Sequence, residues 1–349
     1  MSMSRLVFAP YDPGRHSEVR RLFSEYRHKD HQLGAMDVSK RRMAEYLQQT
    51  LSHANNQSIC LRDEGRLVGL ISLKSLPWMS EHFGLRMYAV AHLLADESEG
   101  PLVRARLLRY VIEELPDVDF LDCRVAVDDV HGAHALEICG FRYVGTEIYL
   151  GQRLEPREEP DLHPDFEIAT CSVADREQVL QIAERTHIHN RFVYDPKINI
   201  NAAKSLYRRL VSNCFTQEPF HVLVARSRGS VQGFIVSKIN STFSETVGKA
   251  CGSLDFIGVR PDSRNKGLGA ALNEWALYHM TEKGARFAAV RTLANNYAAL
   301  ATCYRTGFKV TSTSLHFHRW IHRPAQSLAL GDRSQASCDR QVLSAGALG

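Results

Sequence analysis

The chain has 349 residues, a net charge of +4, 44 % hydrophobic residues and 23 % charged residues. This length allows two domains that each bury a core, and the composition is that of an ordinary globular protein. The mild positive charge suits small anionic molecules, but it is too small for the basic surface of a nucleic-acid-binding protein.

The spacing of the cysteines and the length of the apolar stretches indicate the cellular compartment of the protein. Eight cysteines include no C-x-x-C pair, and several lie in apolar runs such as 58–61. This pattern favours reduced thiols over a disulfide framework or a zinc site. The first residues have no apolar signal core, and no apolar stretch reaches 18 residues. We therefore expect a cytoplasmic protein without a membrane partner.

The first half of the chain predicts alternating helices and strands. We expect helices over 15–27, 40–51 and 103–115 and a β-hairpin with a glycine turn over 62–74. A strand, a helix that ends at Gly140-Phe141 and a last strand follow.

The second half repeats this order. Residues 226–238 match 62–74 at an offset of 164, and Arg291–Asn296 match Arg124–Asp129 at an offset of 167. At the same offset of 167, Gly307-Phe308 matches Gly140-Phe141. Helices are expected over 173–185, 201–212 and 270–281, and the last strand, 314–320, alternates polar and apolar residues. Such a repeat indicates two homologous domains.

We therefore predict an α/β (α+β) fold of two tandem domains, each with a mixed, mostly antiparallel sheet flanked by helices. The first domain is placed at 1–150 and the second at 166–322. A charged, proline-bearing linker is expected over 151–165, and a disordered tail over 323–349.

One loop in the second half predicts a chemistry. Arg264-x-x-Gly267-x-Gly269 lies between an apolar strand and a helix. A helix N-terminus presents unpaired N–H groups and a positive dipole end, and glycines let phosphates approach the backbone. The spacing fits neither a P-loop nor a dinucleotide-binding fingerprint. The corresponding stretch of the first half, 89–102, is acidic and lacks these glycines, so we expect that domain to be a degenerate copy. Its expected roles are structural support and part of an acceptor pocket.

The loop resembles the coenzyme A loop of the GNAT family of N-acetyltransferases. The last helix resembles that family's N-x-x-A-x-x-x-Y-x-x-x-G-F motif, with Asn296, Ala299, Gly307 and Phe308 in place and Cys303 at the tyrosine position. Within the family, residues 76–84 and several stretches up to Trp320 resemble the bacterial TDP-fucosamine N-acetyltransferases, whose acceptor is an amino sugar on a nucleoside diphosphate.

The resemblance implies acetyl-CoA as co-substrate and assigns residues to it. These are Phe256, Ile257 and Val259 on the strand, Arg264, Asn265, Lys266, Gly267, Leu268 and Gly269 in the loop, and Asn296 and Ala299 on the helix. Backbone N–H groups of the loop would hold the pyrophosphate, while its two basic side chains add charge. An N–H group on the strand would polarise the thioester oxygen.

The proton donor for the departing thiolate stays open between Cys303, Tyr304 and no dedicated residue. Cys303 occupies the motif position, and its ordinary pKa of about 8.5 is nearly matched to that of the coenzyme thiol. Tyr304 lies about 100° further round the helix and fits only if the helix is shifted by one residue.

Asp255 beside the cofactor strand is the first candidate base. Glu245, His187 and His189 are alternatives. His316, His318 and His322 resemble a ligand cluster, but no Cys or acidic partner stands at metal spacing, and we expect no metal.

The resemblance thus predicts an N-acetyltransferase that acts on the primary amine of a small molecule by direct attack in a ternary complex. The expected acceptor is an amino sugar, and a nucleotide-linked one fits the resemblance best. The alternatives are an aminoglycoside, amino-acid or protein N-acetyltransferase, or a non-catalytic acyl-CoA-binding module. Whether the chain forms a homodimer is left open by the sequence.

Overall fold

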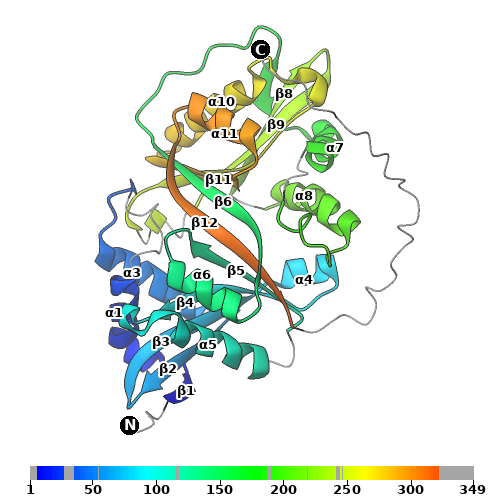
Figure 1. Ribbon diagram of the computed structural model, residues 1–349. Helices are drawn as coiled ribbons and strands as arrows, with labels where there is room; N and C mark the ends of the chain where they lie inside the picture. Colours follow the sequence, from blue (N-terminus) through cyan, green and yellow to red (C-terminus); the bar gives the residue numbers. More distant parts are fainter. Residues whose placement is uncertain are drawn as a thin grey trace, which may run out of the picture.

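The computed structural model describes residues 6–26, 35–53, 55–114, 118–186, 190–217, 219–240, 244–245 and 247–321. It shows two α/β units joined through a shared sheet (Figure 1). The tail predicted over 323–349 lies outside the described residues, as do His187, His189 and His322.

Both units contain the predicted order of helices and strands. In the first unit the strands are β1 (Leu6–Pro10), β2 (Asn56–Asp63), β3 (Arg66–Ser75), β4 (Met87–Ala95), β5 (Phe120–Ala126) and β6 (Arg142–Arg153). Its helices are α1 (His16–Glu25), α3 (Lys40–Gln49), α4 (Pro77–Phe83), α5 (Gly100–Glu114) and α6 (Val130–Ile138).

In the second unit the strands are β7 (Glu167–Thr170), β8 (Phe220–Ser227), β9 (Ser230–Ile239), β10 (Cys251–Val259), β11 (Phe287–Leu293) and β12 (Lys309–Trp320). Its helices are α7 (Arg176–Thr186), α8 (Ile200–Cys214), α10 (Leu268–Glu282) and α11 (Tyr297–Arg305). None of the helices in the described ranges is long and apolar enough to cross a membrane.

The two predicted hairpins have matching turns. Gly65 and Gly229 adopt φ values of 84° and 77°, and the residues before them, Glu64 and Arg228, also have positive φ. Two successive left-handed residues suit the right-handed twist of a hairpin, which explains why glycine recurs at this point of the repeat.

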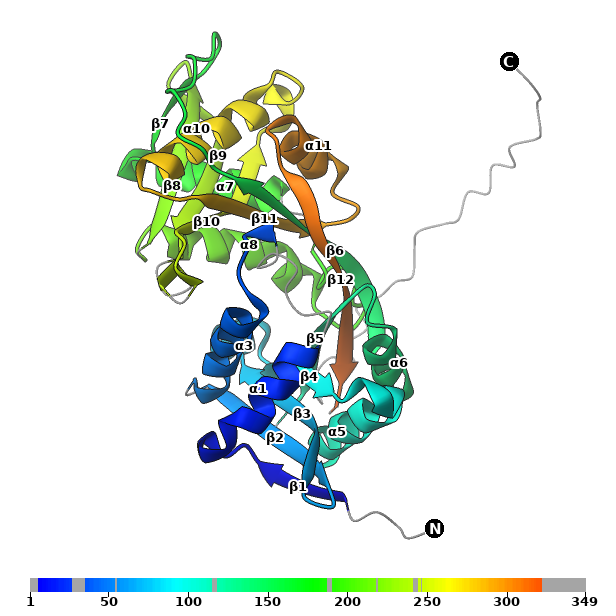
Figure 2. The same cartoon turned by 90° about the vertical axis from the view of Figure 1, so that its left-hand side faces the viewer.

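Each unit gives its last strand to the other. The sheet runs in the order β1-β2-β3-β4-β5-β12-β6-β11-β10-β9-β8-β7, so β12 pairs with β5 of the first unit and β6 pairs with β11 of the second. Figure 2 shows β6 and β12 running between the two units. The predicted linker over 151–165 therefore begins inside β6, which extends to Arg153.

The exchange creates a pseudo-twofold axis at the centre of the sheet. In the β6–β12 ladder, Glu147 pairs with Ser314, which is its own equivalent at the repeat offset of 167. Arg124 pairs with His316, and its equivalent Arg291 pairs with Tyr149. The sheet around the axis is therefore built equally from both halves of the chain.

One glycine in each unit packs against a helix, and these contacts show which residues of α5 and α10 are equivalent. A Cβ at Gly69 would lie 2.9 Å from both Val103 and Leu107 of α5, and one at Gly233 would lie 3.3 and 3.2 Å from Leu268 and Leu272 of α10. Both helices thus pack against a bare strand backbone in the same register.

Candidate active site

The cofactor strand leaves its parallel neighbour halfway along. β10 pairs with β11 from Cys251↔Phe287 to Leu254↔Val290, whereas it follows β9 as far as Val259↔Gly233. The β9 register shifts between Leu254 and Phe256, so Asp255 is a bulged residue, which bends a strand locally. The predicted cofactor residues Phe256, Ile257 and Val259 all lie on the diverging half.

The glycine loop follows this strand directly and begins α10. Asn265 and Gly267 have positive φ values of 61° and 81°, and Gly267 is the N-cap of α10 with no side-chain cap. The helix begins at Leu268. Residues 264–267 are exposed while Leu268 is buried. Since the first-turn amides of a helix lack acceptors inside the helix, the backbone here is suited to an anionic group.

The second motif glycine leaves room beside the helix terminus. A Cβ at Gly269 would meet only Thr302, at 3.5 Å, which is an ordinary contact. Arg264 and Lys266 are exposed cations within the same loop. The residues present therefore fit a pyrophosphate.

His163 also contacts this loop, which sequence reasoning missed. Its Nε2 lies 3.0 Å from the Lys266 carbonyl oxygen, and its Nδ1 accepts a hydrogen bond from the Asp165 backbone N–H at 3.2 Å. The pattern assigns the neutral tautomer with a proton on Nε2. No local pattern could have indicated this contact, because 103 residues separate the two partners.

Helix α11 separates the two candidate proton donors. Asn296 caps the helix by accepting from the Ala299 N–H at 3.4 Å, and it donates to Thr292 at 3.0 Å. Cys303 is 4 % exposed within the apolar core, and burial raises the pKa of its thiol to about 11. Tyr304 is 52 % exposed. Only the tyrosine presents its polar group at the surface.

The candidate base Asp255 is held by its neighbours. Its carboxylate lies 2.7 Å from the Lys238 ammonium and accepts a hydrogen bond from Ser253 at 2.7 Å. Both partners come from the strands on which the bulge lies. The alternative Glu245 is exposed and stands outside this arrangement.

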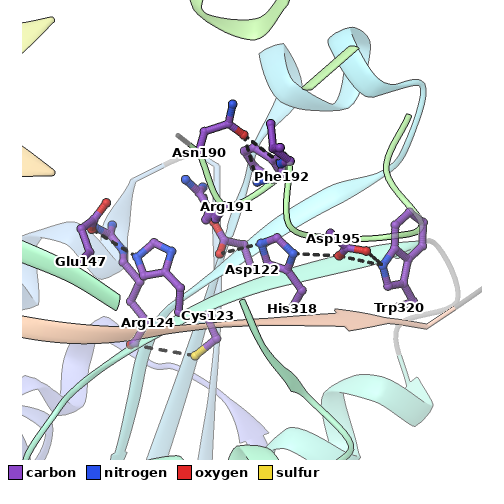
Figure 3. Close-up of polar contacts among 12 residues, drawn as sticks. Asp122, Cys123, Arg124, Glu147, Asn190, Arg191, Phe192, Asp195, His318 and Trp320 are labelled. Carbon is purple, nitrogen blue, oxygen red and sulfur yellow. Dashed lines mark hydrogen bonds and ion pairs between the residues drawn. The ribbon is translucent and has the colours of Figure 1, made fainter. Parts of the chain in front are cut away.

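A polar cluster occupies one face of the sheet around the pseudo-twofold axis. We call it the seam cluster. It consists of Asp122 and Arg124 of β5, Glu147 of β6, Arg191 and Asp195 of the α7–α8 connection, Arg291 of β11, and His316 and His318 of β12. Most of these residues are shown in Figure 3.

Glu147 is the central anion of the seam cluster. It contacts Arg124 Nη1 at 3.3 Å, Arg291 Nε at 3.3 Å and His316 Nε2 at 3.2 Å. Burial alone would raise the pKa of this carboxyl, but Arg291, His316 and Arg124 more than offset that effect and hold the pKa well below its usual range. Burial lowers the pKa of His316. The carboxylate is therefore charged and the imidazole neutral at pH 7.

The other end of the seam cluster pairs two carboxylates with His318 and Arg191. His318 Nδ1 lies 2.8 Å from Asp195, and Arg191 lies 2.5 Å from Asp122 (Figure 3). Two of the three histidines that resemble a ligand cluster, His316 and His318, thus contact carboxylates. No group of three His, Cys, Asp or Glu residues in the described part of the chain is placed to hold a metal ion, and the expectation of no metal stays a prediction.

Tyr207 of α8 connects the seam cluster to the cofactor strand. Its ring meets Phe256 of β10 edge to face, with centroids 5.8 Å apart. Burial raises the pKa of Tyr207, and Arg191, Arg291 and Glu147 are the charged groups that act on it. Tyr207 therefore contacts the diverging half of β10 and lies within electrostatic range of three charged residues of the seam cluster.

The first unit is filled at the corresponding helix terminus. In the register that the packed glycines define, Arg104 of α5 stands at the position of Gly269. Its side chain is 1 % exposed, and its guanidinium lies over the Tyr26 ring at 5.8 Å. Tyr26 in turn donates a hydrogen bond to Asp129, the N-cap of α6 and the equivalent of Asn296. The chain's own side chains fill the space beside this helix terminus.

Comparisons with known proteins cover the second unit or both units. Residues 177–308 match the acetyltransferase (GNAT) family. The spore coat polysaccharide biosynthesis protein SpsD of Bacillus subtilis is 24 % identical over 294 residues, which cover 83 % of this chain and 98 % of that protein. A mycothiol acetyltransferase of Thermobifida fusca is 26 % identical over 47 % of this chain and 50 % of its own length.

Two solved structures cover both units. A GCN5-related N-acetyltransferase from Sphaerobacter thermophilus has a TM-score of 0.61 at 13 % identity, and covers 91 % of this chain and 96 % of that one. A tandem GNAT protein from the clavulanic acid biosynthesis pathway has a TM-score of 0.53 at 14 % identity, and covers 92 % and 100 %. The predicted tandem GNAT fold is confirmed. Residues 177–308 therefore form an acetyltransferase domain of the GNAT family, and the family and the relatives' names indicate an acetyl-CoA-dependent N-acetyltransferase.

Proposed function

We propose that this enzyme acetylates the primary amine of an amino sugar, and that the sugar binds on the seam cluster between the two units. The observation that carries the proposal is the position of Tyr207. It links the diverging cofactor strand, through Phe256, to a face rich in hydrogen-bonding side chains. A sugar offers many hydroxyl groups to such a face. The relative SpsD, named for polysaccharide biosynthesis, spans both units and supports a carbohydrate acceptor.

The cofactor residues proposed from the sequence stay together in this proposal. The N–H groups of Gly267, Leu268 and Gly269 bind the pyrophosphate, and Arg264 and Lys266 add charge. Asn265 shapes the loop through its positive φ, while Asn296 and Ala299 form the start of α11. Acetyl-CoA, when bound, supplies the acetyl group as a thioester.

Three groups of the chain then have separate roles in the direct transfer of the acetyl group within a ternary complex. A backbone N–H group on the diverging half of β10 polarises the thioester oxygen. Tyr304 gives its phenolic proton to the departing sulfur, since its side chain is exposed whereas the thiol of Cys303 is buried in the core. Asp255 accepts the proton that the amine loses, and Lys238 orients its carboxylate.

Turnover with a panel of amines tests this function. Free thiol released from acetyl-CoA would be measured with amino sugars, nucleotide-linked amino sugars, aminoglycosides, amino acids and a lysine peptide. We expect release only with amino sugars, confirmed by a mass increase of one acetyl group on the sugar. Release with another class alone would replace the proposed acceptor.

A second candidate function is a non-catalytic acyl-CoA-binding module. It is favoured by the cysteine at the position where the family motif has tyrosine. Binding of coenzyme A without release of its thiol in the presence of any amine of the panel would establish this alternative.

The proposal also includes a location in the cytoplasm, since the seven cysteines in the described ranges are all free.

A further inference from the structure

We propose that an anionic group of the acceptor, a phosphate or a carboxylate, binds between Arg124 and Arg291 at the pseudo-twofold axis. This inference rests on the proposed function and names the chemical class of its substrate. The two arginines are equivalent in the repeat, one from each unit, and they meet over a single carboxylate.

The carboxylate of this arrangement is buried, and its two guanidinium groups are exposed. The Glu147 side chain is 9 % exposed, whereas those of Arg124 and Arg291 are 42 % and 51 % exposed. Glu147 engages Nη1 of Arg124 and Nε of Arg291, so it fixes one nitrogen of each guanidinium. Each guanidinium carries five N–H donors, and the remaining donors can reach a ligand. The carboxylate therefore orients the pair without covering it.

Arg124, Arg291 and Glu147 together carry one excess positive charge. Glu147 is the one carboxylate that Arg124 and Arg291 contact among the described residues, and both arginines also hydrogen-bond the Tyr149 hydroxyl group. The third contact of that carboxylate, His316, is neutral at pH 7. The next acid along the face, Asp122, is engaged by Arg191, and Asp195 is engaged by His318 and Trp320. No other carboxylate contact to the two arginines occurs in the described residues.

The repeat itself shows how this excess arises. Glu147 and Ser314 are equivalent and face each other across the axis, so strict symmetry would place two carboxylates below two arginines. The second unit has a serine instead. One negative charge is thereby missing, and a ligand can supply it. Paired guanidiniums match the geometry of phosphate and carboxylate oxygens.

The position suits an acceptor as well as an anion. Both Arg291 and Glu147 act on Tyr207, which contacts Phe256 of the cofactor strand. An acceptor held by its anionic group at the axis would therefore lie beside the diverging half of β10. The first unit thus contributes Arg124 and Glu147 to the site, although its own cofactor position is filled.

Calorimetric titration of the coenzyme A-saturated protein tests the site without turnover. The probes are thymidine diphosphate, glucosamine 6-phosphate, glucuronate and neutral N-acetylglucosamine. Saturation with coenzyme A keeps the glycine loop occupied. We expect an anionic probe to bind, and Arg124→Gln or Arg291→Gln to weaken it about tenfold or more. Preference between the phosphate-bearing probes and glucuronate identifies the source of the anion.

Two further variants sharpen the result. Ser314→Glu adds the missing carboxylate and should weaken the anion as strongly as loss of an arginine. Arg66→Gln is the matched control, because Arg66 is 53 % exposed and pairs with Asp96 and Glu99 far from the axis. Thermal melts verify that each variant is folded. Failure of every anionic probe to bind, or equal weakening by Arg66→Gln, overturns the proposal. Thiol release tests the proposed function separately, so the two can fail independently.

Discussion

The two units share a fold but differ at one helix terminus. In the second unit Gly269 leaves the space beside the start of α10 open, with Thr302 at ordinary contact distance. In the first unit Arg104 stands at that position and is buried against Tyr26. At this position the helix start of the second unit is open to a ligand, whereas that of the first unit is filled by the chain itself.

The loops before α5 and α10 differ in charge. Arg264 and Lys266 are exposed cations in the second unit, whereas Asp96 and Glu99 precede α5 in the first. These acids are not isolated charges, since both pair with Arg66 at 3.0 Å. The first unit has thus replaced an external anion with internal ion pairs, while it keeps the strand that carries Glu147. Under the proposed function, the first unit no longer binds the cofactor but still contributes to the acceptor site.

The largest effect, a loss of coenzyme A affinity, is expected when the helix start of the second unit is changed to resemble that of the first. Gly269→Arg should fill the space at the start of α10 and weaken coenzyme A binding roughly 100-fold or more, equivalent to about 2.7 kcal/mol. Gly269→Ala is the matched control, because its Cβ would make only an ordinary contact. Calorimetric affinities compare the two. If Gly269→Arg binds as tightly as Gly269→Ala, the comparison between the units is wrong.

The converse change should affect stability and leave binding unaltered. Arg104→Ala removes a buried side chain, and we expect a loss of roughly 2 kcal/mol in the free energy of unfolding. Arg106→Ala on the same helix is exposed and should change it by less than about 0.5 kcal/mol. Urea denaturation measures both. Equal losses for the two variants would show that the Arg104 contacts contribute nothing.

A smaller effect should separate the two candidate donors on α11. Tyr304→Phe removes an exposed hydroxyl and should lower kcat about tenfold, with water replacing the donor in part. Cys303→Ala should leave kcat unchanged and cost about 1 kcal/mol of stability, because the thiol is a core group. Steady-state rates and melting curves check both. An unchanged rate in Tyr304→Phe would remove it as the donor.

The smallest effect concerns the seam that both units share. The pKa of His316 is lowered in the folded chain, so below the ordinary histidine pKa of about 6.5 the unfolded chain binds more protons and stability falls. His316→Asn should reduce the stability lost between pH 7.5 and 5.5 by about 1 kcal/mol. His53→Asn, at an exposed position, should leave the loss unchanged. Urea denaturation at the two pH values decides.

The sequence predicted whatever depends on local pattern. The hairpin glycines and the helix that ends before Gly307 recur at fixed offsets, and they lie where expected, as does the glycine loop of the second half. The strand exchange left no such trace, since β6 and β12 alternate in the same way whichever unit they join. Arg124 and Arg291 did stand in matching segments, but only the pairing of Glu147 with Ser314 shows that they meet.

The stoichiometry of coenzyme A tests the central claim most directly. Calorimetric titration of the wild-type chain should give one site per chain, because among the described residues the space beside the helix start is open at Gly269 and filled by Arg104 in the first unit. Two sites of similar affinity would show that the first unit also binds the cofactor, despite Arg104. A single site that persists in Gly269→Arg would place binding in the first unit and contradict the account.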